Sequence, residues 1–410
     1  MSWKLFYFFV FIFLISCTSK QSQQKSLFLD GKCYVIDLDD KREESIPLSS
    51  IFNHVRTIIL ENGDDCLIGN INDLQVFDGN IYILDSRKAK SLFVFDMEGK
   101  FIQKIGGIGN GPGEYLEPND FTLDRENRII YLCDLRNRIH KYQLNGTFIN
   151  TITINTPNSA KGTPNSKAIF IQYYNGRLYS SQIWWDKSDD NYMLLEIDPS
   201  DGKILSSSLP VKYNKGWNEL YFSGYSRFFM SRANNPPRYN QMFMDYIVSI
   251  GKEITPYIEL KSKYLTTESD IEDFRGKDGL PVNTMNVIRS PKIFNVNCFI
   301  ENDDFIRFRL GMQLSSLFTV VFYKKTGEVK LANYLRNDLI YKQDQKSALG
   351  GFVFADAKGA YEILDTQRGM HNYIQSSVME NKVVPDLDKL DQLMKLTAES
   401  NPAIFFYEFK

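Results

Sequence analysis

The sequence has few of the side chains that most often build metal or catalytic centres. Its 410 residues include three histidines, which lie far apart at His54, His140 and His371. The five cysteines form no CxxC pair or other metal-ligand spacing, and no Gly-x-Ser-x-Gly motif marks a serine nucleophile. We therefore expect no metal site and no cofactor, and we identify no catalytic residue.

Apolar runs long enough to span a membrane are also missing. A membrane-spanning helix needs about 20 apolar residues, whereas the N-terminal run at residues 5–15 has 11. A run of this length fits the hydrophobic region of a secretory signal peptide. Residues 14–17 (LISC) resemble a bacterial lipobox, in which cleavage leaves a lipidated cysteine, here Cys17. We predict a lipoprotein signal peptide over residues 1–16; the alternative is an ordinary signal peptide that happens to contain Cys17.

The segment after the cysteine predicts a tether. Residues 18–25 are polar and offer no apolar anchor, so we expect a lipidated, flexible tether over residues 17–31. This arrangement predicts an outer membrane lipoprotein. Some surface lipoproteins carry an acidic run after the lipidated cysteine, whereas this stretch is basic. We therefore favour a periplasm-facing protein and keep display at the cell surface as the alternative.

A large excess of charge of either sign is absent. The chain has 48 basic and 50 acidic residues and a formal net charge of −2. Nucleic-acid-binding domains usually present a strongly basic face, so we expect no nucleic-acid partner. We expect contact with a membrane through the lipid anchor only. The remaining partner classes are an envelope protein or a glycan.

What the sequence does contain is internal repetition. Residues 80–105 and 127–152 share one order of short apolar runs and turns. Matching positions recur 47 residues later, from Phe95, Gly99, Phe101 and Ile105 to Tyr142, Gly146, Phe148 and Ile152. A unit of about 45 residues has room for four strands of about five or six residues, which is the size of one propeller blade. Fainter copies follow, and we count about six blades.

We therefore predict an all-β fold, a six-bladed β-propeller over residues 32–410. An insertion is expected at about 265–292 and a short C-terminal helix at about 386–399, where leucines recur at helical spacing. Residues 403–409 are strand-like. We expect them to close the ring by pairing with an N-terminal strand, at either 33–37 or 56–60.

Four cysteines other than Cys17 lie in the predicted propeller. Cys33, Cys66, Cys133 and Cys298 allow three full pairings in an oxidising compartment, so their disulfide state stays open. Cys133 alternates with apolar residues on one strand face. We therefore expect it to be a buried thiol.

Several segments of the chain resemble the six-bladed β-propeller lipoproteins of the bacterial cell envelope, which are related to NHL-repeat propellers. The segments that carry the resemblance are the lipobox, the two clear blades, and residues 46–52, 106–115 and 401–407. The resemblance is firm over residues 32–155 and patchy between 160 and 380. It implies the propeller fold, but most members of this family have no assigned biochemical activity.

One repeated polar feature is a candidate ligand site. Asn72-Asp73 and Asn119-Asp120 stand at the entrance to inner strands, near the expected mouth of the central channel. Propellers commonly bind ligands there. The alternative, which we favour, is that Asp73 and Asp120 accept backbone N–H bonds from the neighbouring blade.

Two further candidates lie on predicted loops. Trp184 and Trp185 are candidates for an aromatic shelf, although blade packing explains at least one of them. Arg227, Arg232 and Arg238 form a possible rim patch, for which a solvated loop is the simpler explanation. A phosphate-binding loop leads into a helix, whereas the glycine segment at residues 106–113 is followed by another predicted strand. We interpret it as a connection between blades.

The lipid anchor, the tether and the rigid propeller together predict a non-catalytic binding or scaffold module for a partner protein or an extracellular glycan. The rival hypothesis is a glycan-active hydrolase or lyase that uses carboxylates at the channel mouth. Fold does not decide between them. Two carboxylates about 5 to 10 Å apart in a deep cleft would favour hydrolysis.

Overall fold

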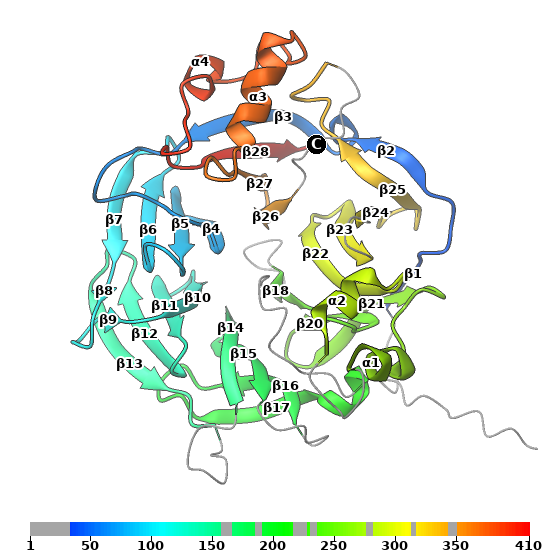
Figure 1. Ribbon diagram of the computed structural model, residues 1–410. Helices are drawn as coiled ribbons and strands as arrows, with labels where there is room; N and C mark the ends of the chain where they lie inside the picture. The colour runs from blue at the N-terminus through cyan, green and yellow to red at the C-terminus, as the bar shows by residue number, and fades with distance from the viewer. Residues whose placement is uncertain are drawn as a thin grey trace, which may run out of the picture.

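The computed structural model describes residues 33–156, 166–184, 191–215, 228–229, 236–275, 282–312, 317–342 and 351–410. Six sheets of four or five strands stand around a central axis, so the predicted six-bladed propeller is confirmed (Figure 1). The predicted lipidation site Cys17, with the signal peptide and the tether, lies outside the described residues. Within the described part of the chain, no helix is long and apolar enough to cross a membrane.

The first three blades are four-stranded antiparallel meanders. Blade 1 contains β4 (Asp73–Phe77), β5 (Asn80–Asp85), β6 (Ser91–Asp96) and β7 (Phe101–Ile105). Blade 2 contains β10 (Pro118–Asp124), β11 (Ile129–Asp134), β12 (Arg138–Gln143) and β13 (Phe148–Thr153). Blade 3 contains β14 (Ser166–Tyr174), β15 (Arg177–Trp184), β16 (Tyr192–Ile197) and β17 (Ile204–Pro210). Blades 1 and 2 are the two sequence repeats.

The remaining blades include strands from the N-terminus. Blade 4 contains β18 (Phe228–Phe229), β19 (Arg238–Tyr239), β20 (Tyr246–Ile250), β21 (Ile254–Lys261) and, at its edge, β1 (Tyr34–Asp37). Blade 5 contains β22 (Ile293–Glu301), β23 (Phe305–Met312), β24 (Leu317–Tyr323), β25 (Val329–Arg336) and, at its edge, β2 (Glu43–Pro47). Blade 6 contains β26 (Phe352–Ala355), β27 (Gly359–Leu364), β28 (Ala403–Phe409) and β3 (Phe52–Ile59).

The N-terminal segment therefore crosses the outside of three blades in turn. β1 and β2 pair in parallel with the outer strands β21 and β25, and β3 pairs antiparallel with β28. Blade 6 thus combines both ends of the chain (Figure 1). The predicted closure through residues 56–60 is confirmed, whereas residues 33–37 belong to blade 4 instead.

The hydrophobic core lies between neighbouring blades. Middle strands are buried on both faces, as in β6, where only the last residue is partly exposed. One cluster joins Tyr82 and Val94 of blade 1 to Phe121, Leu123 and Ile130 of blade 2. Apolar side chains thus pack from sheet to sheet, and this packing accounts for the high aromatic content.

The helices differ from the sequence prediction. The helix expected at 386–399 is reduced to α4 (Leu390–Leu393), and α3 (Met370–Met379) was not predicted. Asp388 explains the shortening, because it bonds to the outer strand of blade 6: the Thr57 N–H donates to its Oδ2 (2.9 Å) and the Thr57 hydroxyl to its carbonyl (2.8 Å). Lys389 then takes a left-handed φ of 53°, so the helix begins only after it.

The periodic leucines are nevertheless buried, because Leu387, Leu393 and Leu396 pack into the core beside blade 6. Residues 265–292, the expected insertion, contain α1 (Glu268–Arg275) and α2 (Thr284–Arg289) between blades 4 and 5. Two single 3-10 turns, η1 (Leu48–Ser50) and η2 (Val211–Asn214), complete the described elements.

The glycine segment connects blade 1 to blade 2, as predicted. It forms a small parallel ladder of β8 (Gly107–Ile108) and β9 (Glu114–Tyr115). The Glu114 carboxylate accepts the Gly111 N–H at 2.7 Å, and a Cβ on Gly109 would lie 2.0 Å from Glu114 Oε2. An acidic side chain therefore occupies the space in which a phosphate would have to bind.

The four described cysteines are free thiols. Cys133 is fully buried, as expected from its position on β11, and Cys66 is buried as well. Cys33 and Cys298 are half-buried.

Candidate functional site: the central channel

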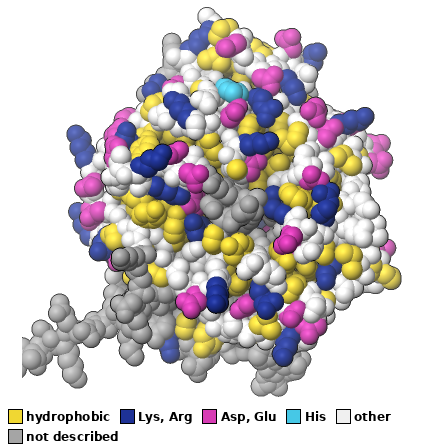
Figure 2. All heavy atoms as spheres, turned by 180° about the vertical axis from the view of Figure 1, so that it is seen from behind, with side chains coloured by type: hydrophobic (Ala, Val, Ile, Leu, Met, Phe, Trp, Pro, Cys, Tyr) yellow, Lys and Arg dark blue, Asp and Glu magenta, His cyan; other side chains and the backbone are white. Residues whose placement is uncertain are grey.

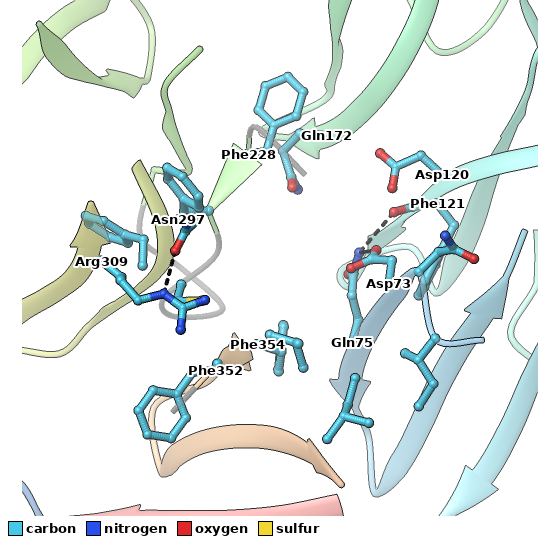
Figure 3. Close-up of a pocket in the computed structure, with 18 of the residues that line it drawn as sticks. Asp73, Gln75, Asp120, Phe121, Gln172, Phe228, Asn297, Arg309, Phe352 and Phe354 are labelled. Atoms are coloured by element: carbon cyan, nitrogen blue, oxygen red, sulfur yellow. Dashed lines mark hydrogen bonds between the residues drawn. The ribbon is translucent and has the colours of Figure 1, made fainter. Parts of the chain in front are cut away.

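A cavity of about 300 Å³ lies at the centre of the ring. Every blade contributes to its lining, through residues at or beside the inner strands. Figure 3 shows polar side chains on two facing walls and phenylalanine rings between them. A second hollow of about 490 Å³ adjoins it and shares Asn72, Arg309, Val353 and Arg368 with it.

One wall of the channel carries the predicted carboxyl groups. Asp73, at the start of β4, is half-buried, and its Oδ1 accepts the Leu74 N–H at 2.9 Å. Asp120, on β10, is buried, and its Oδ2 accepts the Ile171 N–H of blade 3 at 2.7 Å. The predicted contact with a neighbouring blade therefore holds for Asp120, whereas the bonds of Asp73 stay on its own strand.

Both carboxyl groups have unusual proton affinities. Burial raises the pKa of Asp73 to about 6. Burial, followed by the negative charge of Asp73, raises the pKa of Asp120 well above its ordinary value. Near neutral pH the wall therefore presents Asp73 as its ionised group.

Two glutamines extend this wall and were missed by sequence reasoning. The Gln75 side-chain amide donates to the Phe121 carbonyl at 2.9 Å and so bridges blades 1 and 2 (Figure 3). The Gln172 amide donates to Thr122 Oγ1 at 3.1 Å and to the Tyr173 carbonyl at 2.8 Å. Among the described residues neither Oε1 atom receives a hydrogen bond. A signal did exist for Gln75, because residues two apart on a strand share a face and Asp73 was already a candidate.

The facing wall is basic. Arg309 of β23 is half-buried and donates through Nε to Asn297 Oδ1 at 3.0 Å (Figure 3). Arg368 and Arg87 line the adjoining hollow, and Arg368 pairs with Asp365 at 3.3 Å. None of these residues was predicted. Arg309 and Arg368 lie on a second strand and on a loop in the degenerate half of the chain, and Arg87 lies on a loop of blade 1 that carries no motif.

Apolar surface separates the two walls. The rings of Phe228, Phe352 and Phe354 line the cavity, and Cys298 lies beside them. Carboxylate, amide and guanidinium groups thus converge around an apolar middle, an arrangement typical of small-ligand sites.

Among the other predicted residues that the structure describes, Asn72 alone lies at this cavity; Arg238 is not on the rim but is buried in blade 4, where it pairs with Glu301 at 3.0 Å. Asn72 lines the cavity, with its Oδ1 accepting the Ser86 N–H at 2.8 Å, whereas Asn119 on β10 does not line it. The side chain of Trp184, the last residue of β15, and all of Trp185, Arg227 and Arg232 lie outside what the structure describes.

The histidines occupy unrelated places. His54 lies on β3 and pairs with Glu408 at 2.8 Å. His140 is buried on β12 between Asp134 and Thr151, and His371 is buried on α3. In the described part of the chain, no cluster of three or more histidine, cysteine or acidic side chains could hold a metal ion.

On the face seen in Figure 2, charged side chains are mixed in sign. Figure 2 shows lysine and arginine interspersed with aspartate and glutamate over the face seen from behind. The opposed acidic and basic walls of the channel therefore contrast with the mixed charges of that face.

The sequence profile of a domain of unknown function, DUF4934, matches residues 33–408, which include every blade. The chain belongs to the DUF4934 family. A search of curated proteins finds no match to this DUF4934 chain.

Two solved structures are similar to the DUF4934 chain. It is similar to a protein of Bacteroides fragilis NCTC 9343 whose name describes it as exported, with 18% identity, a TM-score of 0.69 and coverage of 92% of this chain and 100% of that one. It is also similar to a DUF4221 family member from Bacteroides vulgatus ATCC 8482, with 12% identity, a TM-score of 0.48 and coverage of 88% and 97%. At these identities the likeness concerns the fold alone.

Proposed function

We propose that this protein is an exported, envelope-anchored binding protein whose central channel takes up part of a glycan. The observation that carries the proposal is the channel itself, in which polar groups from facing blades converge around phenylalanine rings. A concave site of this kind suits a sugar unit better than the flat surface of a folded protein. A partner protein is the second binding class, and it would use the exposed rim.

The chemistry of the walls supports a hydroxyl-rich ligand. The Oε1 atoms of Gln75 and Gln172 and the carboxylate of Asp73 are acceptors, and sugar hydroxyl groups are donors that can reach several acceptors at once. The rings of Phe228 and Phe352 offer apolar faces for the C–H side of a sugar ring. Buried polar groups discriminate strongly against ligands that leave them unpaired.

The proposed location is the outer membrane, with the propeller facing the periplasm. The lipobox at residues 14–17 supports it, and the exported name of the Bacteroides fragilis relative agrees with it. Lipid attached at Cys17 would anchor the protein stably if several acyl chains are present, because a single chain binds only weakly and reversibly.

Binding can be tested with a set of neutral and acidic oligosaccharides and the mature protein carrying Cys17→Ala. Isothermal titration calorimetry gives the affinity. Gln172→Ala is expected to weaken binding about tenfold, which corresponds to the loss of about one hydrogen bond, roughly 1.4 kcal/mol. Binding of no oligosaccharide in the set would contradict the proposal.

The rival function, that of a glycan-active hydrolase or lyase, is favoured by one specific observation. Asp73 and Asp120 line the same cavity, and burial raises the pKa of both carboxyl groups, with the charge of Asp73 adding to the effect at Asp120. A neutral acid beside an ionised carboxylate is the pattern that glycosidases use. Against it, the Ile171 N–H occupies one oxygen of Asp120. Turnover of a bound oligosaccharide, lost in both Asp73→Asn and Asp120→Asn, would establish catalysis.

A further inference from the structure

We propose that the ligand carries an oxyanion, a carboxylate or a sulfate on a sugar unit, and that Arg309 binds it. This inference rests on the proposed glycan-binding function and names the chemical class of the glycan. It follows from the basic wall of the channel, because a site that binds only hydroxyl groups would not need these arginines.

The orientation of the Arg309 guanidinium group suits the binding of an anion. Its Nε–H donates to the neutral side chain of Asn297 at 3.0 Å, and this bond holds the plane of the guanidinium group. Within the described part of the chain, no carboxylate lies within ion-pair distance of Arg309. Among the described residues nothing is bonded to its two terminal nitrogens, and a planar guanidinium binds carboxylate or sulfate oxygens through two parallel hydrogen bonds.

The local field also favours an anion. Arg307 lies two residues before Arg309 and is fully buried. Burial lowers the pKa of Arg307 to about 10, and the neighbouring charge of Arg309 acts in the same direction. The nearby Glu362 carboxylate acts on Arg307 in the opposite direction and offsets part of this repulsion; it accepts the Gly351 N–H at 3.0 Å and the Tyr407 hydroxyl at 2.8 Å. An anion at Arg309 would thus relieve repulsion between two arginines.

The adjoining hollow carries a small excess of positive charge. Arg87 and Arg368 line it together with Arg309, and Glu362 and Asp365 line it as well. Only Arg368 has an acidic partner among the described residues, Asp365; the arginine of that pair is exposed and the carboxylate is half-buried. Three arginines against two carboxylates leave the hollow with a net positive charge, which favours the approach of an anion.

The opposite wall fixes the orientation of the ligand. Asp73 would repel a second negative charge, whereas its carboxylate and the Oε1 atoms of Gln75 and Gln172 accept from hydroxyl groups. The ligand must therefore combine an anion at one end with hydroxyl donors at the other. A uronic acid or a singly sulfated sugar has both on one ring.

The test compares matched ligands. Oligogalacturonic acid and its fully methyl-esterified form share their hydroxyl groups and differ in charge, and a sulfated neutral oligosaccharide separates sulfate from carboxylate. Binding is measured by calorimetry on the mature Cys17→Ala protein. A second readout is protection of the Cys298 thiol from maleimide, with Cys33→Ser removing the other half-buried cysteine.

The variants are Arg309→Gln, which keeps a donor but removes the charge, and Arg128→Gln as a control. Arg128 is exposed and pairs with Asp78, so it provides a charge change outside the channel. We expect the acidic ligand to bind at least tenfold more tightly than the ester. Arg309→Gln should lose this difference with an unchanged melting temperature, and Arg128→Gln should keep it.

Two outcomes would overturn the inference in distinguishable ways. Equal affinity for the acid and the ester, unchanged in Arg309→Gln, would refute the oxyanion site and leave glycan binding intact. Failure of all three ligands to bind or to protect Cys298 would refute the inference and the proposed function together. Loss of binding of only the sulfated ligand in Arg309→Gln would support the site with sulfate as its anion.

Discussion

Replacing Asp73 by asparagine should stabilise this protein at neutral pH, because the carboxylate is held where burial disfavours its charge. The pKa of Asp73 is raised from an ordinary 3.8 to about 6. A raised pKa means that the folded state binds more protons than the unfolded state between these two values. Stability must therefore fall as the pH rises from about 4 to about 6.

The magnitude follows from the size of that difference. Each pKa unit corresponds to about 1.4 kcal/mol, which sets an upper limit of about 3 kcal/mol. Asp73 is only half-buried, so water screens part of the penalty and we expect about 1 to 2 kcal/mol at pH 7. The asparagine Oδ1 can still accept the Leu74 N–H, so the variant loses the charge and little else.

The assay is urea unfolding of both proteins at several pH values from 4 to 8, followed by tryptophan fluorescence. Asp73→Asn should match the wild type near pH 4 and exceed it in stability above pH 6. Asp64→Asn, at an exposed position, is the control and should change little at any pH. A variant that is less stable than the wild type at pH 7, or a difference that does not vary with pH, would refute the reasoning.

Three further predictions concern closure and anchoring. Tyr407→Phe should lower the free energy of unfolding by about 1 to 3 kcal/mol, because the buried hydroxyl donates to Glu362 and accepts from Asn337, both at 2.8 Å; an unchanged urea midpoint would contradict this. Deleting residues 402–410 removes β28, which joins β27 to β3, and should abolish cooperative unfolding; a truncated protein with the wild-type melting temperature would show that closure is dispensable. Cys17→Ala should abolish acyl labelling and release the protein from membrane fractions, and a variant that stays acylated would exclude Cys17 as the lipidation site.

Much of the fold was predictable because a propeller blade is a local unit. Its strands are neighbours in sequence, so short apolar runs and turn residues are enough to mark it, as in the two copies 47 residues apart. The closing strand at 403–409 could also be recognised, because a closed propeller leaves no strand edge unpaired and its last strand therefore needs a partner strand. The C-terminal helix was predicted too long. Its start is set by the hydrogen bonds between Thr57 and Asp388, and Thr57 lies on a strand more than 300 residues away in the sequence.

The candidate site was predictable only in part. Asp73 and Asp120 could be found because the repeat places both at the same position of an inner strand. Arg309 and Asn297 could not, because they lie in degenerate blades, and no spacing indicates that they meet. Gln75 could have been predicted, because it lies two residues after Asp73 and therefore shares a face of the strand with it.

The sequence by itself determined the blade and the number of its copies, because each of these depends on residues close together in the chain. The tertiary structure alone decided which side chains face one another across the channel. A ring brings together single residues from six blades, and their separation in sequence bears no relation to their separation in space. The opposition of Asp73 and Arg309 is therefore a property of the closed ring, created when β28 pairs with β3.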